Sequence, residues 1–154
     1  MTYVEKHPAF QSLMDQAYDR YQAAERMSSD EFIAQLTGLE VIAVPLGNFV
    51  YQVQNGGFSQ WHDNGYSVNR SMVRTALQVV GTPAAQAAAA CLTGFEQLAH
   101  EMDVDLADRN SYCSDWNSEQ WHETEGQLGS WFYVIDNQLL DDAEAFFSKV
   151  APVS

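Results

Sequence analysis

Histidines and carboxylates are the side chains of this sequence that could carry out acid–base or metal chemistry. The four histidines are His7, His62, His100 and His122. His62 precedes Asp63, and His122 lies in the segment Trp121-His122-Glu123-Thr124-Glu125. That segment lacks the second histidine of the zinc-binding pattern His-Glu-x-x-His. Because carboxylates are abundant here, a histidine beside one is expected by chance, and we predict no catalytic residue and no metal site.

Signals for nucleophilic catalysis are also missing from the sequence. Of the two cysteines, Cys91 lies in an alanine-rich run and Cys113 in a polar stretch, and no Cys-x-x-Cys motif supports a metal cluster. The serine-nucleophile pattern Gly-x-Ser-x-Gly does not occur either. We therefore expect a protein that is not an enzyme. A small enzyme with a site near residues 57–63 is kept as a third hypothesis.

Negative charge is the chemical feature that this chain concentrates. The whole chain carries a formal charge of −14, and twelve acidic residues face a single basic one, Arg109, between positions 101 and 144. All of them except Asp136 are predicted to form a partner-binding surface: Glu101, Asp103, Asp105, Asp108, Asp115, Glu119, Glu123, Glu125, Asp141, Asp142 and Glu144. Crowded carboxylates repel one another, so this concentration of charge does not help the chain to fold. They form either a solubility feature or a surface for a basic partner.

The charge also excludes several classes of partner. Nucleic acids and anionic membranes are themselves negative, so direct binding to either is disfavoured. No stretch approaches the ~20 apolar residues that span a bilayer, and the first residues lack the basic start and apolar run of a signal peptide. We expect a cytoplasmic protein. Adaptation to high salt is an alternative source of the charge, but it would spread acidic residues over the whole surface.

Hydrophobic periodicity predicts a mostly α-helical, bundle-like fold in a single acidic domain over residues 1–154. The length is sufficient to bury a core, and aromatic residues make up 12% of the chain. Helices are expected from Pro8 to about residue 24, after a capping Ser28, through 39–54, from Ser67 to Gly81, through 83–100, and over about 115–128 and 137–150.

Four expectations about these elements can be checked against a structure. Pro45 should restart a helix after a break, because proline suits a first turn, and a short strand is the alternative at 39–44. The alanine-rich helix 83–100 should lie at the centre of the core. The apolar segment 131–135 should be buried. Residues 103–114 should form an acidic loop.

The most distinctive local pattern is the segment from Phe49 to Trp61. It predicts an apolar helix that ends at Gly56 and Gly57, at least one of which should have a positive φ. Phe58 and Trp61 follow at a three-residue spacing and should fold back onto the core. A phosphate-binding loop would require further glycines and a nearby lysine, so the glycines are interpreted as structural.

This pattern resembles the signature of a family of small bacterial domains of unknown function that includes a dimeric DNA-mimic protein. The residues that carry the resemblance are Asn55, Gly56, Gly57, Phe58, Gln60 and Trp61. The resemblance implies a mainly helical fold, no cofactor and a homodimer. In the DNA-mimic member it implies an acidic surface that occupies a DNA-binding transcription factor. This chain keeps the Asn of the pattern at position 64 but has His62 and Asp63 where a second aromatic residue is usual.

Charge and resemblance together predict a DNA mimic that binds a basic DNA-binding protein and competes with DNA. Twelve carboxylates equal the charge of roughly six base pairs, or about 20 Å of duplex. On a helix, Asp115, Glu119 and Glu123 would lie about 6 Å apart along the axis, a spacing similar to that of phosphates on one strand. The alternative is an acidic interaction or immunity-type module whose partner is not a DNA-binding protein.

Overall fold

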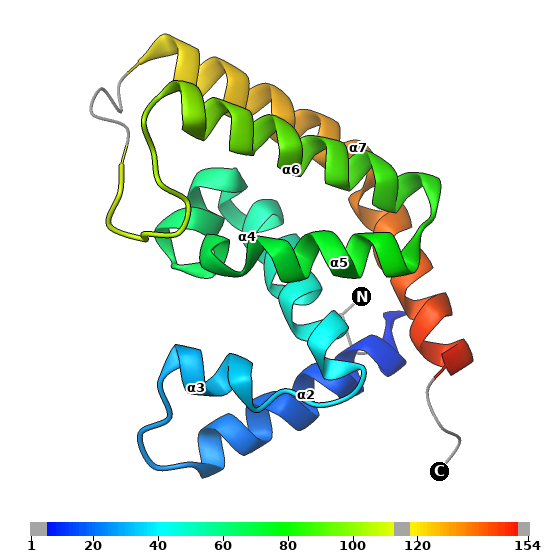
Figure 1. The fold of residues 1–154 in the computed structure, drawn as a ribbon. Coiled ribbons are helices and arrows are strands. Elements are labelled where there is room, and N and C mark those ends of the chain that lie inside the picture. Colours follow the sequence, from blue (N-terminus) through cyan, green and yellow to red (C-terminus); the bar gives the residue numbers. More distant parts are fainter. Residues whose placement is uncertain (1–5, 113–117, 151–154) are drawn as a thin grey trace.

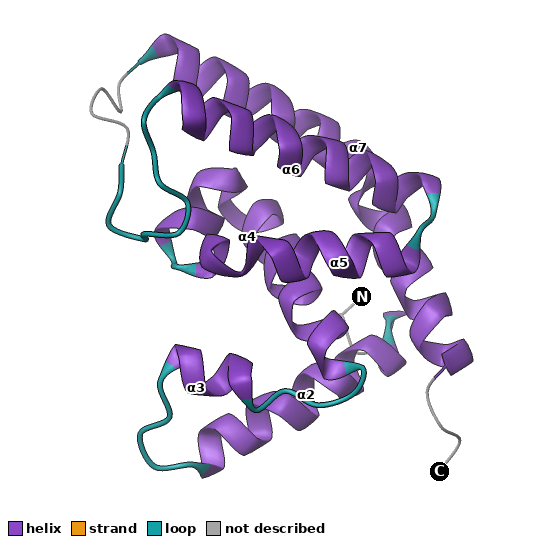
Figure 2. Cartoon of the chain, viewed as in Figure 1, coloured by secondary structure: helices purple, strands orange, loops and turns teal. Residues whose placement is uncertain are grey.

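The computed structural model describes residues 6–112 and 118–150, and these form an all-helical fold (Figures 1 and 2). The elements in chain order are α2 (Pro8–Ala23), α3 (Ser29–Ala34), α4 (Glu40–Asp63), the 3₁₀ turn η1 (Tyr66–Asn69), α5 (Arg70–Val80), α6 (Pro83–Glu101) and α7 (Glu119–Val150). The predicted mostly α-helical fold class is confirmed, and the described parts of the chain contain no strand.

Helix α4 occupies the centre of the molecule, with α2, α5 and α7 packed around it (Figure 1). Helix α6 lies along α7 on the outside and reaches the core through one face only. Ala85, Ala88 and Leu92 on that face are buried, whereas Gln86 and Ala90 are exposed. The expectation that α6 is the central helix is therefore wrong. Its small side chains instead make one face of a peripheral helix.

Most of the helix ends are set by the residues that the sequence indicated. The Ser28 hydroxyl accepts a hydrogen bond from the amide of Glu31 at 3.1 Å, and the Thr82 hydroxyl accepts one from Ala85 at 3.4 Å. Gly81 ends α5 in the left-handed conformation with φ +69°. Side-chain oxygens satisfy amides that the first turn of a helix leaves without partners, and glycine takes a positive φ without steric cost.

Helix α4 differs from the prediction at its start. It begins at Glu40 and passes through Pro45, so the expected restart at Pro45 and the alternative strand at 39–44 are both wrong. Proline has no N–H to donate to the carbonyl of Val41, so the helix loses one hydrogen bond. Val41 lies on the exposed side of the helix. Burial of the surrounding apolar residues in the core outweighs this local cost.

Helices α2 and α3 form a unit that we call the N-terminal hairpin, and polar contacts attach it to α4. The Arg20 guanidinium is paired with the buried carboxylate of Glu40, which also accepts a hydrogen bond from the amide of Thr37 at 3.0 Å. Hydrogen bonding to Arg20 lowers the pKa of Glu40. The Tyr18 hydroxyl donates to Asn48 Oδ1 at 2.9 Å. These contacts fix the hairpin across the first half of α4.

Helix α7 is a single element where two helices were predicted. The segment 131–135 was expected to be buried, but Trp131 is 55%, Tyr133 49% and Val134 81% exposed, and only Phe132 is fully buried. The expectation is wrong because α7 lies on the outside and turns one face toward the core. Consecutive residues of a helix point in different directions, so an apolar run of five cannot all face inward.

Candidate binding sites at the acidic end and beside the N-terminal hairpin

Six of the predicted surface carboxylates gather at one end of the molecule, where α6 ends and α7 begins (Figure 1). Gln120 Nε2 donates to a Glu101 carboxylate oxygen at 3.4 Å and ties the start of α7 to the end of α6. All six are exposed, and we call them the acidic end: Glu101, Asp103, Asp105, Asp108, Glu119 and Glu123. Asp115 lies outside the described residues, and so does the predicted helical start at that position.

The loop of the acidic end begins at a helix terminus that reverses the chain. Asp103 has φ +58°, and the amide of Val104 donates to the Ala99 carbonyl at 2.8 Å. This six-to-one bond is the mark of a Schellman ending, in which a left-handed residue stops the helix. Helix α6 therefore does not carry its acidic row past residue 101. The carboxylates of Asp105 and Asp108 accept hydrogen bonds from backbone amides within the loop instead.

Two other predicted surface carboxylates contact residues at the start of α2. Glu144 accepts hydrogen bonds from the amides of Ala9 and Phe10 at 3.0 and 2.9 Å. Asp141, although exposed, has an oxygen 2.9 Å from Nε2 of the buried His7. The structure thus places a carboxylate at the positive N-terminal end of α2, where it satisfies open amides and favours the helix dipole.

The remaining acidic residues of α7 also make contacts within the fold. Asp136 is buried and accepts from Gln54 Nε2 at 3.0 Å, and the half-buried Asp142 accepts from Gln138 Nε2 at 2.8 Å. Asp136 lies about 20 Å beyond Glu123 along the helix axis. Among the described acidic residues of the span 101–144, the six of the acidic end are thus exposed, whereas Glu125, Asp136 and Glu144 accept hydrogen bonds from other elements.

Gly56 and Gly57 interrupt α4, and the chain resumes a helix at once over residues 58–63. Gly57 has φ +80°, as predicted for at least one of the pair. The glycines break the regular helix as predicted, but they form a kink between two helical segments and do not end the helix. Glu125 from α7 is half-buried and accepts a hydrogen bond from the amide of Ser59 at 3.0 Å. A Cβ at position 57 would lie 2.7 Å from Glu125 Oε1, so glycine makes room for this carboxylate.

The amide side chains of the motif converge on one buried residue. Gln60 Nε2 and Asn64 Nδ2 donate to Gln52 Oε1 at 2.9 and 2.8 Å. Gln52 lies one helical turn before the glycines, so these bonds hold the two pieces of α4 at a fixed angle. The motif residues that are fully buried are Phe58 and Trp61, and those that are exposed are Asn55 and Gly56.

A cavity of about 580 Å³, which we call the acidic-end cavity, opens beside the kink. Tyr112 and Trp121 supply aromatic walls, and Asp63 and Glu125 supply carboxylates. Trp121 is held by its Nε1, which donates to Ser59 Oγ at 3.2 Å. Desolvation by neighbouring atoms raises the pKa of Asp63, against a smaller opposing effect of His62. Aromatic faces and carboxylates together favour a positively charged guest.

His62 also lines this cavity, but both of its ring nitrogens are engaged in the fold. Nδ1 lies 2.6 Å from Ser67 Oγ, and Nε2 lies 2.7 Å from the Ser111 carbonyl, which can only accept. Ser67 in turn donates to the Leu106 carbonyl at 2.8 Å. His62 is 2% exposed and joins η1 to the loop. Within residues 6–112 and 118–150, no cluster of three or more His, Cys, Asp or Glu side chains could hold a metal ion.

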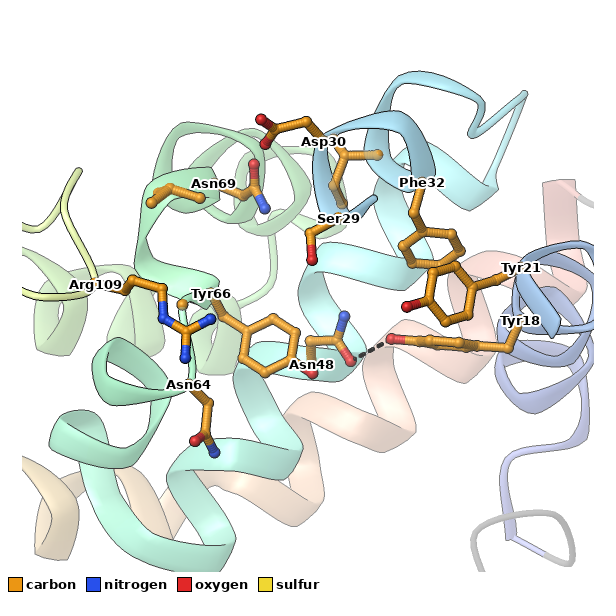
Figure 3. Close-up of a pocket in the computed structure, with 13 residues that line it drawn as sticks. Tyr18, Tyr21, Ser29, Asp30, Phe32, Asn48, Asn64, Tyr66, Asn69 and Arg109 are labelled. Carbon is orange, nitrogen blue, oxygen red and sulfur yellow. Dashed lines mark hydrogen bonds between the residues drawn. The ribbon is translucent and has the colours of Figure 1, made fainter. Parts of the chain in front are cut away.

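A second cavity of about 320 Å³, the hairpin pocket, lies between the N-terminal hairpin and η1 (Figure 3). Tyr18 and Tyr21 pack around Phe32, with ring centroids 4.9 and 5.1 Å from it. Tyr66 faces them from η1, and Arg109 reaches in from the acidic loop (Figure 3). Sequence reasoning missed this pocket because its residues come from separate segments. The one available signal was Arg109, the single base within the acidic span.

Comparison with known protein families gives one match. The family described as DMP19-like protein matches residues 34–150. No curated protein and no solved structure matches the chain. The matched region contains the kink motif and the acidic end, and it leaves out α2 and all but the last residue of α3. None of the described helices combines the length and apolar character needed to cross a membrane.

Proposed function

Because the chain belongs to the DMP19-like protein family, we propose that it is a DNA-mimic protein whose acidic end occupies the DNA-binding surface of a basic protein. The observation that supports this best is the sorting of the carboxylates. The six carboxylates of the acidic end are exposed, whereas Glu125, Asp136 and Glu144 of α7 accept hydrogen bonds from other parts of the fold. A transcription factor or similar DNA-binding protein would be the partner, in the cytoplasm.

The acidic end of one chain has too few charges to match the length of DNA that a protein usually contacts. Six carboxylates equal the charge of about three base pairs, or roughly 10 Å of duplex axis. DNA-binding proteins commonly contact a longer stretch than this. A homodimer would present two acidic ends, so we include dimerisation in the proposal.

The acidic-end cavity supplies a specific contact within this surface. We propose that it receives an arginine or lysine side chain of the partner. Trp121 and Tyr112 would contact the cationic group through their aromatic faces, and Glu125 and Asp63 would neutralise it. Desolvated charge contacts of this kind contribute most of the specificity of an interface, whereas exposed charges mainly accelerate association.

A pair of charge-matched variants tests the proposal. The first carries Asp108→Asn, Glu119→Gln and Glu123→Gln at the acidic end. The control carries the same loss of charge at three exposed positions of the N-terminal hairpin and its turn: Asp15→Asn, Asp19→Asn and Glu25→Gln. Each protein is immobilised, exposed to cell lysate at low salt, and eluted first with duplex DNA and then with high salt.

We expect wild type and the control variant to capture the same DNA-binding proteins and to release them to duplex DNA. The acidic-end variant should lose them, because exposed charges attract a partner over a Debye length of ~8 Å at physiological ionic strength. Equal capture by all three proteins, or capture that duplex DNA cannot reverse, would rule out mimicry by the acidic end.

The second candidate is an interaction or immunity-type module whose partner does not bind DNA. The exposed Trp131 and Val134 on α7 favour it, because such side chains bind partners without help from charge. Its binding would persist at high salt and in the acidic-end variant. An enzyme working near residues 57–63 is less well supported, because the fold engages both ring nitrogens of His62.

A further inference from the structure

The hairpin pocket has no part in the proposed function, and its composition differs from that of the acidic end. Tyr18, Tyr21 and Phe32 come from the N-terminal hairpin, which precedes the residues matched by the family. Asn48, Asn64 and Tyr66 come from the matched region. The pocket therefore exists only where this chain places its hairpin against the family domain.

Aromatic rings make the walls of the hairpin pocket. Tyr18 and Tyr21 lie on the hairpin side with Phe32, and Tyr66 lies on the opposite side (Figure 3). Burial raises the pKa of both Tyr18 and Tyr66. Aromatic walls on opposite sides of a cavity favour a planar ring as the guest. A volume of about 320 Å³ fits one substituted ring system.

Neutral amides supply the polar groups inside the pocket. Asn48 Oδ1 accepts the Tyr18 hydroxyl at 2.9 Å, so its orientation is set, and its Nδ2 has no partner among the described residues. Asn69 adds a further amide at the side, whereas the amide of Asn64 points away from the pocket and donates to Gln52 Oε1 (Figure 3). Amides of this kind fix the orientation of a ligand without adding charge.

Arg109 determines the charge that the pocket prefers. Within the described residues it makes no hydrogen bond and no ion pair, in a chain that carries −14. Its side chain passes over Gly65, 3.6 Å from where a Cβ would lie, and its guanidinium points toward Tyr66 and Asn64 (Figure 3). The carboxylate of Asp30 lies at the opposite rim of the pocket, on the side of Asn69, and forms no ion pair with Arg109 (Figure 3). A guanidinium left without a carboxylate here is ready to bind one from a ligand.

We propose that the hairpin pocket binds a small planar organic anion, namely an aromatic ring that bears a carboxylate. The ring would lie between Tyr66 and the cluster of Tyr18 and Phe32. The carboxylate would pair with the Arg109 guanidinium, and the Asn48 amide would donate to a second polar group of the ring.

Ligand titration followed by two-dimensional amide NMR tests this proposal on the full chain. The probes are 4-hydroxybenzoate and indole-3-carboxylate, each paired with the corresponding neutral amide. The variants are Arg109→Gln and, as a control that also removes one positive charge, Lys149→Gln on the exposed end of α7. The amide spectrum of each variant reports directly whether it is folded. Tyr21→Ala removes part of an aromatic wall without changing charge.

We expect at least one acid to shift amides around the pocket and to bind about tenfold or more tightly than its amide, as a charge-assisted hydrogen bond implies. Arg109→Gln should remove that preference, Lys149→Gln should keep it, and Tyr21→Ala should weaken acid and amide alike. The proposal is overturned if acid and amide bind equally to wild type, if Arg109→Gln leaves acid binding unchanged, if the shifts map elsewhere, or if neither acid binds at millimolar concentration.

Discussion

Gly57 shows at the scale of one residue how a sequence motif becomes a structural requirement. Its φ of +80° combines with a ψ of −178°, a region of backbone space that only glycine occupies readily. The same position leaves room for Glu125, which comes from α7 and accepts from the amide of Ser59. The sequence predicted the positive φ. It could not predict Glu125, because the carboxylate approaches from a helix that lies 66 residues later in the chain.

We expect Gly57→Val to lower the free energy of unfolding by about 2–3 kcal/mol, through backbone strain and displacement of Glu125. That loss corresponds to a melting temperature lower by roughly 4–12 °C, to be measured by circular dichroism or calorimetry. Gly126→Ala is the matched control, because a methyl group added at this helical glycine would meet no other atom within 4 Å. The control should be neutral or slightly stabilising.

A Gly57→Val protein that melted like wild type but no longer bound its partner would contradict the structural role of this glycine. It would then assign the kink a direct part in binding.

At the scale of elements, α7 departs furthest from the sequence-based expectation. Separate helices over about 115–128 and 137–150 were predicted, yet one helix runs from Glu119 to Val150 and includes Gly126 and Gly129. Packing of its inner face against α4 and α6 overrides the weak local preference of two glycines. The predicted helix ends near Ser28, Thr82 and Gly81 are confirmed. A cap depends on residues that are close in sequence, and packing against distant helices does not override it there.

Helix α2 depends on α7 for its N-terminal cap. Removal of the carboxylate by Glu144→Ala should cost about 1 kcal/mol, a typical loss for an N-terminal cap. Amide hydrogen exchange should accelerate at Ala9 and Phe10 while exchange in α6 stays unchanged. Asp142→Ala is the control, because the hydrogen bond of Asp142 is to Gln138 on its own helix. Equal acceleration in both variants would show that loss of charge, rather than of the cap, loosens α2.

At the scale of the whole molecule, the sequence predicted the fold class and the family better than it located the exposed acidic surface. Twelve acidic residues between 101 and 144 look alike in sequence. The structure separates the exposed acidic end from the carboxylates that hold α2 and α4. No periodicity reveals this division, because the carboxylates that hold α2 and α4 have their partners in distant parts of the chain. The hairpin pocket escaped prediction for the same reason.

The outer face of α7 is the surface where we expect two copies to meet. Trp131 and Val134 leave an apolar area exposed there, and Val134→Arg would place an unpaired charge in that contact. In sedimentation at micromolar concentration, wild type should behave as a dimer of 17.3 kDa chains and Val134→Arg as a monomer. Val79→Arg, at a 41% exposed valine of α5, should remain dimeric.

A wild-type protein that sedimented as a monomer would count against both the dimer and mimicry, because one acidic end covers too short a length of duplex. A dimer that survived Val134→Arg would leave mimicry standing and move the interface elsewhere.

The bonds between Glu144 and the start of α2 also constrain how the protein is made. Synthesis at roughly 5–20 residues per second separates Phe10 from Glu144 by about 7 to 27 seconds on the ribosome. Throughout that interval the first turn of α2 lacks its cap, and the ring of Phe147, which packs edge-on against Phe10 in the finished fold, has not yet been made. Helix α2, the first of the described helices, is therefore among the last to dock. In a nascent chain, the apolar face of α2 stays exposed to chaperones and to neighbouring chains until α7 has been synthesised.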